Sequence, residues 1–516
     1  MAKKPFVMVI LDGWGTTSKR EGNAIALAKT PNFSALMNDC PHVDLEASGA
    51  AVGLPDDLAG NSEAGHMTIG TGRIVEQEVT IIDRAITDRS FFANPVLTSA
   101  LDRVQSGSLH LIGLLSDCGI HSKLRHLYAL LEMAKERGLS KVFIHAITDG
   151  HDVSPQSTGK YFKNLAKEIK KLGVGEIASI VGREYAMDRR KRWDRVGKAY
   201  EAIVMGEGRL SASWKDTLET AYANGETDEL LLPTVMVKDE GRPLTTIENN
   251  DTVIFFNLRS DRNCEFVHSL LDRRFLHFQR RRFPRFNFVS LTEIDQSLRI
   301  PIAYPTAPVA NSFSEYLARV GKRQVRIAET EKYPHITFFA NGRREAPFPS
   351  EDRIFIPSAR LDDYAEKPEM CAGEITDKLL ERLEVGDYNV YVVDLANADS
   401  IAHTGKLGPT ILAVEFIDKC LGRIYKAVKA KDGVLMVTAD HGNAEQMLDG
   451  KRPNYAHSKN PVPLILYSSG HETLAKEGLL SDIVPTLLDL MGEKIPPEMT
   501  GRSLLVRKES PVAAIR

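Results

Sequence analysis

The chain has 516 residues, of which 43% are hydrophobic and 26% are charged, and its formal net charge is −3. This composition is typical of a globular protein with large buried cores and excludes a globally disordered chain. The 66 basic and 69 acidic residues nearly balance, so the protein has no overall positive field and we expect neither nucleic acid nor an anionic membrane as a partner. The length predicts at least two domains.

The N-terminal sequence MAKKPFVMVILDG holds a short apolar run that ends at Asp12 and lacks the features of a signal peptide. No stretch approaches the roughly 20 apolar residues of a membrane span. The five cysteines are scattered and form no CxxC pair, which is typical of reduced thiols. These features predict a cytoplasmic protein.

Short apolar runs rich in β-branched residues predict buried strands. In chain order they cover residues 6–11, 109–115, 142–147, 252–257, 325–328, 390–395 and 434–438. Segments with helical spacing of apolar residues lie at 122–138, 161–173 and 411–430, and Ser122 is the expected N-cap of the first. Strands that alternate with helices predict an α/β fold with a mostly parallel, doubly wound sheet.

Polar residues follow many of these strands, where ligands of open α/β sheets bind. Three fragments stand out: Asp12 in LDGWG, Asp399 with His403 in NADSIAHTG, and Asp440–His441 in TADHGN. Each alone is compatible with a helix cap or a turn. Together they predict a site for divalent ions such as Mn²⁺ or Zn²⁺, because clustered carboxylates repel one another unless cations neutralise them.

His457 in NYAHSKNPVP is a further candidate ligand, although alone it would be interpreted as a surface loop histidine. Ser62, in LAGNSEAGHMTIGTGR, lies among glycines that allow the backbone to approach a phosphate closely. It is a candidate nucleophile if a base or a metal lowers the pKa of its hydroxyl, and otherwise a helix N-cap. His66, one turn later, is either a base or a packing residue.

Residues suited to phosphate and carboxylate groups dominate from about residue 110 to 262. They are His121, Asp152, Arg183, Arg189, Arg259 and Arg262, and Lys332 follows further along the chain. Arginine forks match the paired oxygens of these anions. The basic run at 189–195 is equally compatible with a solvated helix face.

The motifs GNSEAGH, SDCGIHS, DGHD, GREYAMDRRKRWDR, RSDR, AETEKYPHITFF, HTGK, TADHGNAEQM and HSKNPVP occur in this order along nearly the whole chain. In this the sequence resembles the cofactor-independent phosphoglycerate mutases of the alkaline phosphatase superfamily. The resemblance implies a discontinuous metal-binding, phosphatase-like domain at 1–76 and 309–516. It also implies a substrate-binding transferase domain inserted at 77–308.

The implied activity is the interconversion of 3-phosphoglycerate and 2-phosphoglycerate by a monomer, through a phosphoserine on Ser62 and without 2,3-bisphosphoglycerate. By resemblance, one Mn²⁺ belongs to Asp399, His403 and His457, and the other to Asp12, Ser62, Asp440 and His441. The implied substrate-binding residues are His121, His151, Asp152, Arg183, Arg189, Arg259, Arg262 and Lys332. Among them, Asp152 moves protons between the glycerate oxygens and Lys332 neutralises the transferring phosphoryl group.

The chain departs from the family pattern at several positions. Histidine stands at position 151 where the family usually has arginine, and Cys118, Glu184, Arg190, Asp394 and Ala398 also differ. Because histidine titrates near neutrality whereas arginine stays charged, we expect weaker or more pH-dependent substrate binding. No departure removes a candidate metal ligand or Ser62.

Two other functions are compatible with parts of this pattern. A phosphopentomutase or metal-dependent phosphomonoesterase of the same superfamily would keep the metal cluster but lack the set formed by His121, Asp152, Arg183, Arg189 and Arg262. A catalytically silent binding protein would have no reason to retain costly buried carboxylates without their metal.

Overall fold

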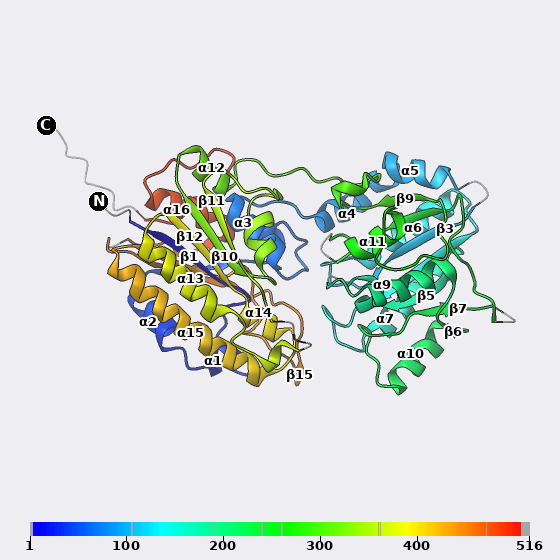
Figure 1. Ribbon diagram of the computed structural model, residues 1–516, viewed down its shortest axis with the longest axis horizontal. Coiled ribbons are helices and arrows are strands. Elements are labelled where there is room, and N and C mark those ends of the chain that lie inside the picture. Colours follow the sequence, from blue (N-terminus) through cyan, green and yellow to red (C-terminus); the bar gives the residue numbers. More distant parts are fainter. Residues whose placement is uncertain are drawn as a thin grey trace. The chain divides into compact units, whose positions relative to one another are not determined.

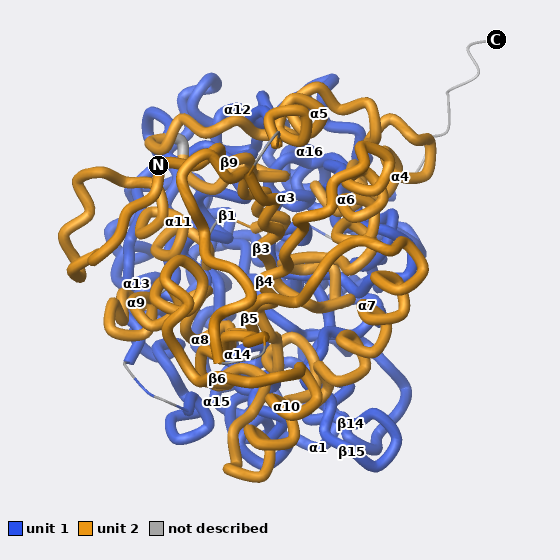
Figure 2. The backbone as a smooth tube through the Cα atoms, turned by 90° about the vertical axis from the view of Figure 1, so that its right-hand side faces the viewer, with its two compact units in different colours: residues 1–77, 307–516 blue, residues 78–306 orange. Residues whose placement is uncertain are grey.

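The computed structural model describes residues 4–104, 107–188, 190–238, 241–259, 262–359, 361, 363–470 and 472–506. The chain divides into two compact units, which are coloured separately in Figure 2. Unit 1 combines residues 1–77 with 307–516, and unit 2 consists of residues 78–306. Both junctions fall within two residues of the boundaries expected from the sequence.

Unit 1 is built on an eight-stranded sheet with the order β11-β10-β12-β1-β13-β16-β2-β17. The strands from β11 to β13 are parallel, whereas β16 is antiparallel to both β13 and β2. The strands are β1 (Phe6–Leu11), β2 (His42–Glu46), β10 (Gln324–Glu329), β11 (Glu351–Ile356), β12 (Val390–Leu395), β13 (Val434–Thr438), β16 (Val462–Tyr467) and β17 (Gly478–Leu479). A separate ribbon pairs β14 (Leu448–Asp449) with β15 (Arg452–Pro453).

Helices cover both faces of this sheet (Figure 1): α13 and α15 pack together on one face, and α3 and α16 on the other. The helices are α1 (Ala24–Leu27), α2 (Pro31–Asp39), α3 (Ser62–Thr71), α12 (Phe313–Arg319), α13 (Ala372–Val385), α14 (Asn397–Ala402), α15 (Leu407–Ala430) and α16 (Ile483–Leu490). Short 3₁₀ or π turns are η1 (Gly49–Val52), η6 (His335–Phe339), η7 (Tyr364–Glu366) and η8 (Leu480–Asp482). The strands β1, β12 and β13 are almost fully buried, as expected for a sheet covered on both sides.

Unit 2 has its own seven-stranded sheet, with the order β6-β7-β5-β4-β3-β8-β9. The strands are β3 (Leu109–Leu115), β4 (Val142–Thr148), β5 (Glu176–Gly182), β6 (Arg209–Ser211), β7 (Thr234–Met236), β8 (Thr252–Phe255) and β9 (Asn287–Ser290). Five neighbouring strands are parallel, namely β5, β4, β3, β8 and β9. At the end of this group, β7 pairs with β5 in the antiparallel direction.

Helices α6 and α7 pack together on one face of the unit 2 sheet, and α9 and α11 on the other. The helices are α4 (Glu78–Thr87), α5 (Pro95–Asp102), α6 (Leu124–Glu136), α7 (Thr158–Leu172), α8 (Arg183–Ala186), α9 (Trp193–Tyr200), α10 (Trp214–Ala223) and α11 (Cys264–Leu271). Short turns are η2 (Ser90–Ala93), η3 (Glu201–Met205) and η5 (Gln296–Leu298).

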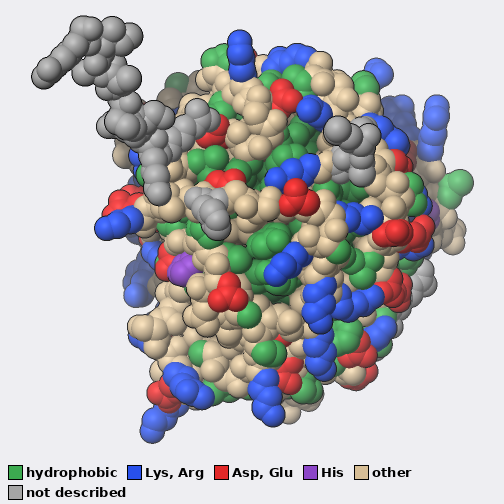
Figure 3. Space-filling view, turned by 90° about the vertical axis from the view of Figure 1, so that its left-hand side faces the viewer, with side chains coloured by type: hydrophobic (Ala, Val, Ile, Leu, Met, Phe, Trp, Pro, Cys, Tyr) green, Lys and Arg blue, Asp and Glu red, His purple; other side chains and the backbone are tan. Residues whose placement is uncertain are grey.

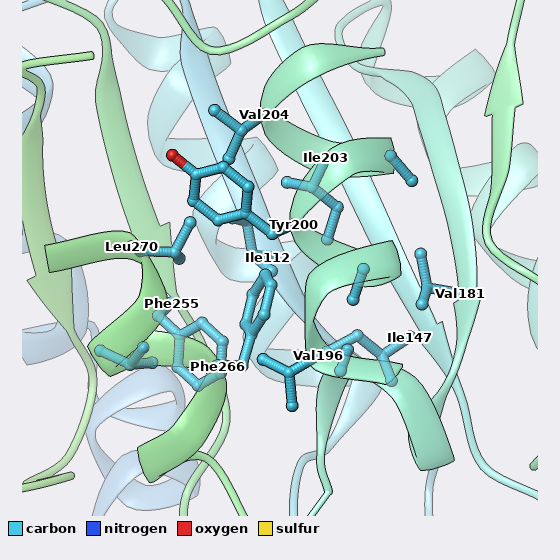
Figure 4. Close-up of a cluster of buried hydrophobic side chains, with 14 of the residues drawn as sticks. Ile112, Ile147, Val181, Val196, Tyr200, Ile203, Val204, Phe255, Phe266 and Leu270 are labelled. Atoms are coloured by element: carbon cyan, nitrogen blue, oxygen red, sulfur yellow. The ribbon is translucent and has the colours of Figure 1, made fainter. Parts of the chain in front are cut away.

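A core of apolar side chains lies between the unit 2 sheet and helices α9 and α11 (Figure 4). Ile112 from β3, Ile147 from β4 and Phe255 from β8 meet Val196 from α9 and Phe266 from α11, and all five side chains are fully buried. Burying one such side chain contributes about 1.5–3 kcal/mol to folding. This core therefore fixes the strands whose ends carry the polar residues described below.

The strands predicted from the sequence are confirmed, although β8 ends at Phe255 rather than at residue 257. The three predicted helices correspond to α6, α7 and α15. The expected N-cap of α6 is wrong: Lys123 occupies the cap position, and Ser122 Oγ instead donates to the carbonyl of Leu114 at 2.5 Å.

Within the described ranges, no helix is both long enough and apolar enough to cross a lipid bilayer. The face drawn in Figure 3 shows basic and acidic side chains interspersed rather than separated by sign. Such mixing is expected where the two kinds of charge occur in nearly equal numbers.

Candidate metal and anion sites

In unit 1 the predicted metal ligands gather at one edge of the sheet. Asp12 follows β1, and Asp440–His441 follow β13. Asp399 lies on α14 after β12, and His403 is the C-cap residue of that helix. These strands are parallel neighbours, so their carboxyl ends meet at the same edge. His457 precedes β16, whose antiparallel direction brings the start of that strand to this edge.

Ser62 is the first residue of helix α3 and is buried at this edge. The helix is capped by Asn61, whose side chain accepts from the backbone N–H of Ala64 at 2.9 Å. The alternative interpretation of Ser62 as an N-cap is therefore wrong. Its hydroxyl lies 3.0 Å from His441 Nε2 and 2.7 Å from Lys332 Nζ.

Lys332 follows β10 and binds three groups at the site. Its ammonium donates to Asp12 Oδ1, Asp399 Oδ2 and Ser62 Oγ, each at 2.7 Å. Burial alone would lower the pKa of this ammonium, but the surrounding carboxylates, above all Asp12, raise it well above its ordinary value. Lys332 is therefore a fixed positive charge beside the Ser62 hydroxyl.

Three acceptor atoms converge around Asp399. His403 Nδ1 lies 3.0 Å from the carbonyl of Tyr455, and His457 Nδ1 lies 2.8 Å from the carbonyl of Gly60. A carbonyl only accepts, so each Nδ1 carries a proton, and in the neutral form of each imidazole Nε2 then presents a lone pair. These two Nε2 atoms are 3.0 Å apart and lie 3.3 and 3.4 Å from Asp399 Oδ1. Converging lone pairs repel unless a cation lies among them, so this group fits a metal ion.

The second group consists of Asp12, Asp440 and His441. Burial lowers the pKa of His441 to about 3, which keeps the imidazole neutral, and its Nε2 lies 3.5 Å from both Asp12 Oδ1 and Asp440 Oδ2. Asp12 Oδ2 is buried without a hydrogen-bond partner in the part of the chain that the structure describes, and Asp440 Oδ2 faces His66 Nδ1 at 3.2 Å and His441 Nε2 at 3.5 Å. Burial and the neighbouring carboxylates raise the pKa of Asp12 well above its ordinary value. Buried carboxylate oxygens beside a neutral imidazole are ligands that suit a divalent ion.

His66, one turn after Ser62 on α3, lies behind this second group. Its Nδ1 is 2.9 Å from the Ser62 carbonyl and 3.2 Å from Asp440 Oδ2, and its Nε2 is 2.9 Å from Asp394 Oδ2. Burial would lower the pKa of His66, but the bonds to Asp394 and Asp440 raise it to about 10. His66 therefore contacts a candidate ligand rather than the Ser62 hydroxyl, which gives it a supporting role and not that of a base.

A second cluster of polar residues lies in unit 2, at the carboxyl ends of β3, β4, β5 and β8. Arg183 Nη1 binds Asp149 Oδ1 at 2.5 Å and Asp152 Oδ2 at 2.6 Å, and His121 Nε2 lies 3.7 Å from Asp152 Oδ2. Arg183 is fully buried, and its Nε and Nη2 atoms have no hydrogen-bond partner within the described residues. Buried, unsatisfied guanidinium donors of this kind suit an anionic ligand.

The charge state of Asp152 follows from its neighbours. Burial alone would raise the pKa of this carboxyl, but Arg183, His121 and His151 together hold it well below its ordinary value. Asp152 is therefore ionised at neutral pH and able to accept a proton.

Three further residues that were predicted to bind substrate, His151, Arg259 and Arg262, belong to the same region of unit 2. His151 Nδ1 lies 3.1 Å from Glu229 Oε1, and His151 and Arg183 together with Arg262 lower the pKa of Glu229 despite its burial. Arg259 and Arg262 follow β8, and Arg262 is buried. Arg189 lies outside the described residues.

Comparisons with known proteins agree over nearly the whole length. The family model described as BPG-independent PGAM N-terminus matches residues 82–296, and the model described as Sulfatase matches residues 388–493. A 2,3-bisphosphoglycerate-independent phosphoglycerate mutase from Clostridium tetani is 45% identical over 98% of this chain and 100% of its own. The chain belongs to the 2,3-bisphosphoglycerate-independent phosphoglycerate mutase family.

The chain is also similar to two further phosphoglycerate mutases. Phosphoglycerate mutase 1 of Methanosarcina acetivorans, also of the 2,3-bisphosphoglycerate-independent kind, is 46% identical over 98% of this chain and 99% of its own. The crystal structure of the Leishmania mexicana phosphoglycerate mutase at low cobalt concentration superposes with a TM-score of 0.90, at 31% identity and 98% coverage of both chains. The predicted fold class, an α/β protein with an alkaline-phosphatase-like domain and an inserted α/β domain, is confirmed.

Sequence reasoning did not include several residues that contact the predicted ones. Asn443 Nδ2 donates to Asp399 Oδ1 at 2.8 Å, and Glu229 pairs with His151. Asp149, which accepts from Arg183, is in contrast a polar residue at the end of a predicted strand. Asn443 and Asp149 lie inside the motifs TADHGN and DGHD, so their proximity to the sites was available from the sequence. Glu229 lies in no such motif, and only the fold brings it to His151.

Proposed function

We propose that the protein interconverts 3-phosphoglycerate and 2-phosphoglycerate by transferring the phosphoryl group to Ser62 and back, without 2,3-bisphosphoglycerate. Membership of the mutase family supports this activity. The observation that carries the proposal is the position of Ser62, whose buried hydroxyl lies between Lys332 Nζ and His441 Nε2 at 2.7 and 3.0 Å. A hydroxyl beside a fixed cation and a candidate metal ligand is placed for nucleophilic attack on phosphorus.

We assign two divalent metal ions, with Mn²⁺ as the expected ion, to unit 1. One belongs to Asp399, His403 and His457, whose unprotonated acceptor atoms converge. The other belongs to Asp12, Ser62, Asp440 and His441. When bound, such ions neutralise phosphoryl charge and lower the pKa of a coordinated hydroxyl. The crystal structure of the Leishmania relative was obtained in the presence of cobalt, which supports the assignment of metal dependence.

The residues of unit 1 handle the phosphoryl group. Ser62 Oγ, in its deprotonated form, attacks the phosphorus of 3-phosphoglycerate in line, so that a bond from Ser62 forms while the bond to the glycerate oxygen breaks. Lys332, fixed by Asp12 and Asp399, neutralises negative charge that develops on the transferring group. Attack by the other glycerate hydroxyl on the phosphoserine then releases Ser62.

The residues of unit 2 handle the glycerate. The buried donors of Arg183, with Arg259, Arg262 and His121, bind its carboxylate, and Arg189 belongs to the same proposed set. The ionised Asp152 accepts the proton of the glycerate hydroxyl that will attack and passes it to the glycerate oxygen that leaves, so that the carboxylate is restored and protons balance over one cycle. His151 takes the place of an arginine in holding the substrate.

The test is mutase activity of the purified protein with Mn²⁺, coupled to enolase and measured with and without 2,3-bisphosphoglycerate. We expect activity that does not need 2,3-bisphosphoglycerate, phosphate trapped on Ser62, and no activity in Ser62→Ala. Release of inorganic phosphate in place of 2-phosphoglycerate would show a phosphomonoesterase. Failure of the wild type to form phosphoserine with Mn²⁺ would favour a binding protein without turnover.

A further inference from the structure

Glu445 is a buried carboxylate in unit 1 that belongs to neither candidate ligand group. It is 1% exposed, and both of its oxygens accept hydrogen bonds. Oε2 accepts from the backbone N–H of Gly15 at 3.0 Å and of Asn443 at 2.8 Å. Oε1 accepts from Asn460 Nδ2 at 2.9 Å and from the Ser458 hydroxyl. Four donors thus converge on one side chain.

These donors come from the three loops that carry most of the proposed metal ligands. Gly15 belongs to the loop after β1, three residues beyond Asp12. Asn443 belongs to the loop after β13, two residues beyond His441. Ser458 directly follows His457 in the loop before β16. One carboxylate therefore connects segments that are more than 400 residues apart in the sequence.

The backbone leaves almost no other room around this carboxylate. A Cβ atom on Gly15 would lie 2.3 Å from Glu445 Cδ, and one on Gly442 would lie 2.5 Å from Oε1. Contacts this short are not tolerated between side chains, so glycine at both positions is what allows the loops to close on Glu445. Backbone bonds from Asn443 N to the Gly13 carbonyl at 3.1 Å and from Ser458 N to the Gly442 carbonyl at 2.9 Å join the same loops directly.

The fourth ligand-bearing segment is connected through Asn443. Its backbone N–H binds Glu445, and its side-chain Nδ2 binds Asp399 Oδ1 at 2.8 Å. Asp399 belongs to α14, so the connection extends to the helix that also carries His403. Every segment that supplies a proposed metal ligand from a loop or from α14 is thus reached from Glu445 by one or two hydrogen bonds.

We propose that Glu445 is a positioning residue for metal binding: it holds the three loops so that the ligand atoms of Asp12, Asp440, His441 and His457 converge. This inference rests on the proposed function, because it takes those residues as metal ligands. Clustered carboxylates such as Asp12 and Asp440 repel one another in the metal-free protein, so convergence requires an external restraint. Outer contacts of this kind determine how strongly a metal is held.

The experiment measures Mn²⁺ affinity by isothermal titration calorimetry, in the absence of substrate, for the full-length wild type and Glu445→Gln. Glutamine keeps the size of the side chain but turns an NH₂ group toward donors, so at least two of the four bonds are lost. We expect Mn²⁺ affinity to fall by about 10- to 100-fold, as for other outer contacts of metal sites. The kcat at saturating Mn²⁺ should fall less than the affinity, because the ligands and Ser62 remain.

A matched control exists in the same unit. Glu351 is also a buried carboxylate that gathers donors, from Asn341 Nδ2 at 2.9 and 3.0 Å, Phe348 N at 3.0 Å and Arg353 Nε at 2.6 Å, but it connects no ligand-bearing loop. Glu351→Gln should lower the melting temperature and leave Mn²⁺ affinity unchanged. Asn460→Ala, which removes a single donor to Glu445, provides a milder variant if Glu445→Gln does not fold, and we expect it to lower Mn²⁺ affinity as well.

The outcomes separate the two proposals. Wild-type protein that binds no Mn²⁺ would overturn the metal assignment of the proposed function. Wild-type protein that binds Mn²⁺, with unchanged affinity in both Glu445→Gln and Asn460→Ala, would overturn the positioning role alone. Equal losses of affinity in Glu445→Gln and Glu351→Gln would show a general effect of stability and would also overturn it.

Discussion

At the scale of single residues, Lys332 is the counterion that stabilises the buried carboxylates of the metal-free site. Its ammonium contacts two buried carboxylates, Asp12 and Asp399, as well as Ser62. Replacing it with methionine would leave both carboxylates in a buried site without their counterion. Removing one partner of a buried ion pair costs about 3–5 kcal/mol, so we expect a loss of this order in the free energy of unfolding of metal-free Lys332→Met.

Urea unfolding with and without Mn²⁺ tests this expectation. Mn²⁺ should restore more stability to Lys332→Met than to the wild type, because it neutralises the same carboxylates. Lys322→Met is the control, since Lys322 pairs with Glu493 at 2.9 Å on a partly exposed surface, where such a pair contributes about 0–1 kcal/mol. Equal losses in the two variants would contradict the role given to Lys332.

His151 is the residue at which this chain is expected to differ most from its relatives. Its contact with Glu229 links its charge to the cluster around Arg183. Because arginine presents a forked guanidinium that binds paired anionic oxygens and histidine does not, we expect the KM for phosphoglycerate to be lower in His151→Arg than in the wild type. At pH 8 the KM of the variant should be about tenfold lower, the value of one charge-assisted hydrogen bond.

Steady-state kinetics at pH 6, 7 and 8 measure this difference. His268→Arg is the control, because His268 pairs with Asp295 at 2.8 Å elsewhere in unit 2 and should not affect the KM. Equal KM values for His151→Arg and the wild type would exclude a role of His151 in holding substrate.

The sequence predicted single residues well where chemistry restricts the residue type. Metal ligands are limited to Asp, His and a few others, so strand ends such as those at Asp12 and Asp440 were recognisable. Residues that act through hydrogen bonds to ligands have no such restriction. Glu445 and Glu229 were missed for this reason, since their partners lie up to 430 residues away and only the fold brings them together.

At the scale of elements, helix α3 depends on glycine for its close approach to the site. A Cβ atom on Gly65 would lie 2.4 Å from the carbonyl oxygen of Asp440 and 2.9 Å from its Cβ. We expect Gly65→Ala to push α3 or Asp440 aside, to lower the free energy of unfolding by about 1–3 kcal/mol and to weaken Mn²⁺ binding. Calorimetric titration and urea unfolding measure the two effects.

Gly408→Ala, in helix α15, is the matched control for this substitution. A Cβ atom there meets nothing within 4 Å apart from its chain neighbours, so alanine should change the free energy of unfolding much less than Gly65→Ala does and should leave Mn²⁺ affinity unchanged. If Gly65→Ala were more stable than the wild type and bound Mn²⁺ with wild-type affinity, the space beside Asp440 would be shown to accommodate a Cβ atom at position 65.

Element positions were predictable because buried strands are continuous apolar runs, whereas their capping residues were not. A serine before a helical pattern often caps the helix, yet Ser122 donates to Leu114 and Ser62 is preceded by the true cap, Asn61. In both cases two polar residues compete for one position, and tertiary contacts decide between them. The sequence pattern contains no information on those contacts.

At the scale of the whole molecule, the two units have separate sheets and separate cores. All proposed metal ligands belong to unit 1. A ligand at 100 times its Kd adds about 2.7 kcal/mol to the state that binds it, so Mn²⁺ should stabilise unit 1 directly. We expect scanning calorimetry to show two unfolding transitions, of which only one moves to higher temperature as Mn²⁺ is added. A single transition, or equal shifts of both, would show that the units unfold together.

Acid should destabilise unit 2, which holds none of the proposed metal ligands. In unit 2 a buried chain of hydrogen bonds joins Asp251, His110, His145 and Ser179 across β3, β4 and β5, with contacts of 3.1, 2.9 and 2.9 Å. Burial, reinforced by His110, holds the pKa of His145 well below its ordinary value, so the folded state keeps this imidazole neutral. The unfolded chain takes up the proton near pH 6.5, and each pH unit below that value costs the folded state about 1.4 kcal/mol.

We therefore expect the transition that Mn²⁺ does not move to shift to lower temperature between pH 7.5 and 5, with a loss of roughly 2 kcal/mol from this one proton. The stability is fully present above pH 6.5 and is lost as the pH falls toward the depressed pKa of His145. In His145→Gln the melting temperature of the same transition should already be lower at pH 7.5, because the hydrogen bonds are weakened. This melting temperature should then fall less between pH 7.5 and 5 than in the wild type. An unchanged pH slope in that variant would show that protons taken up elsewhere in unit 2 cause the loss, with His126, whose pKa burial also lowers, as the next residue to replace.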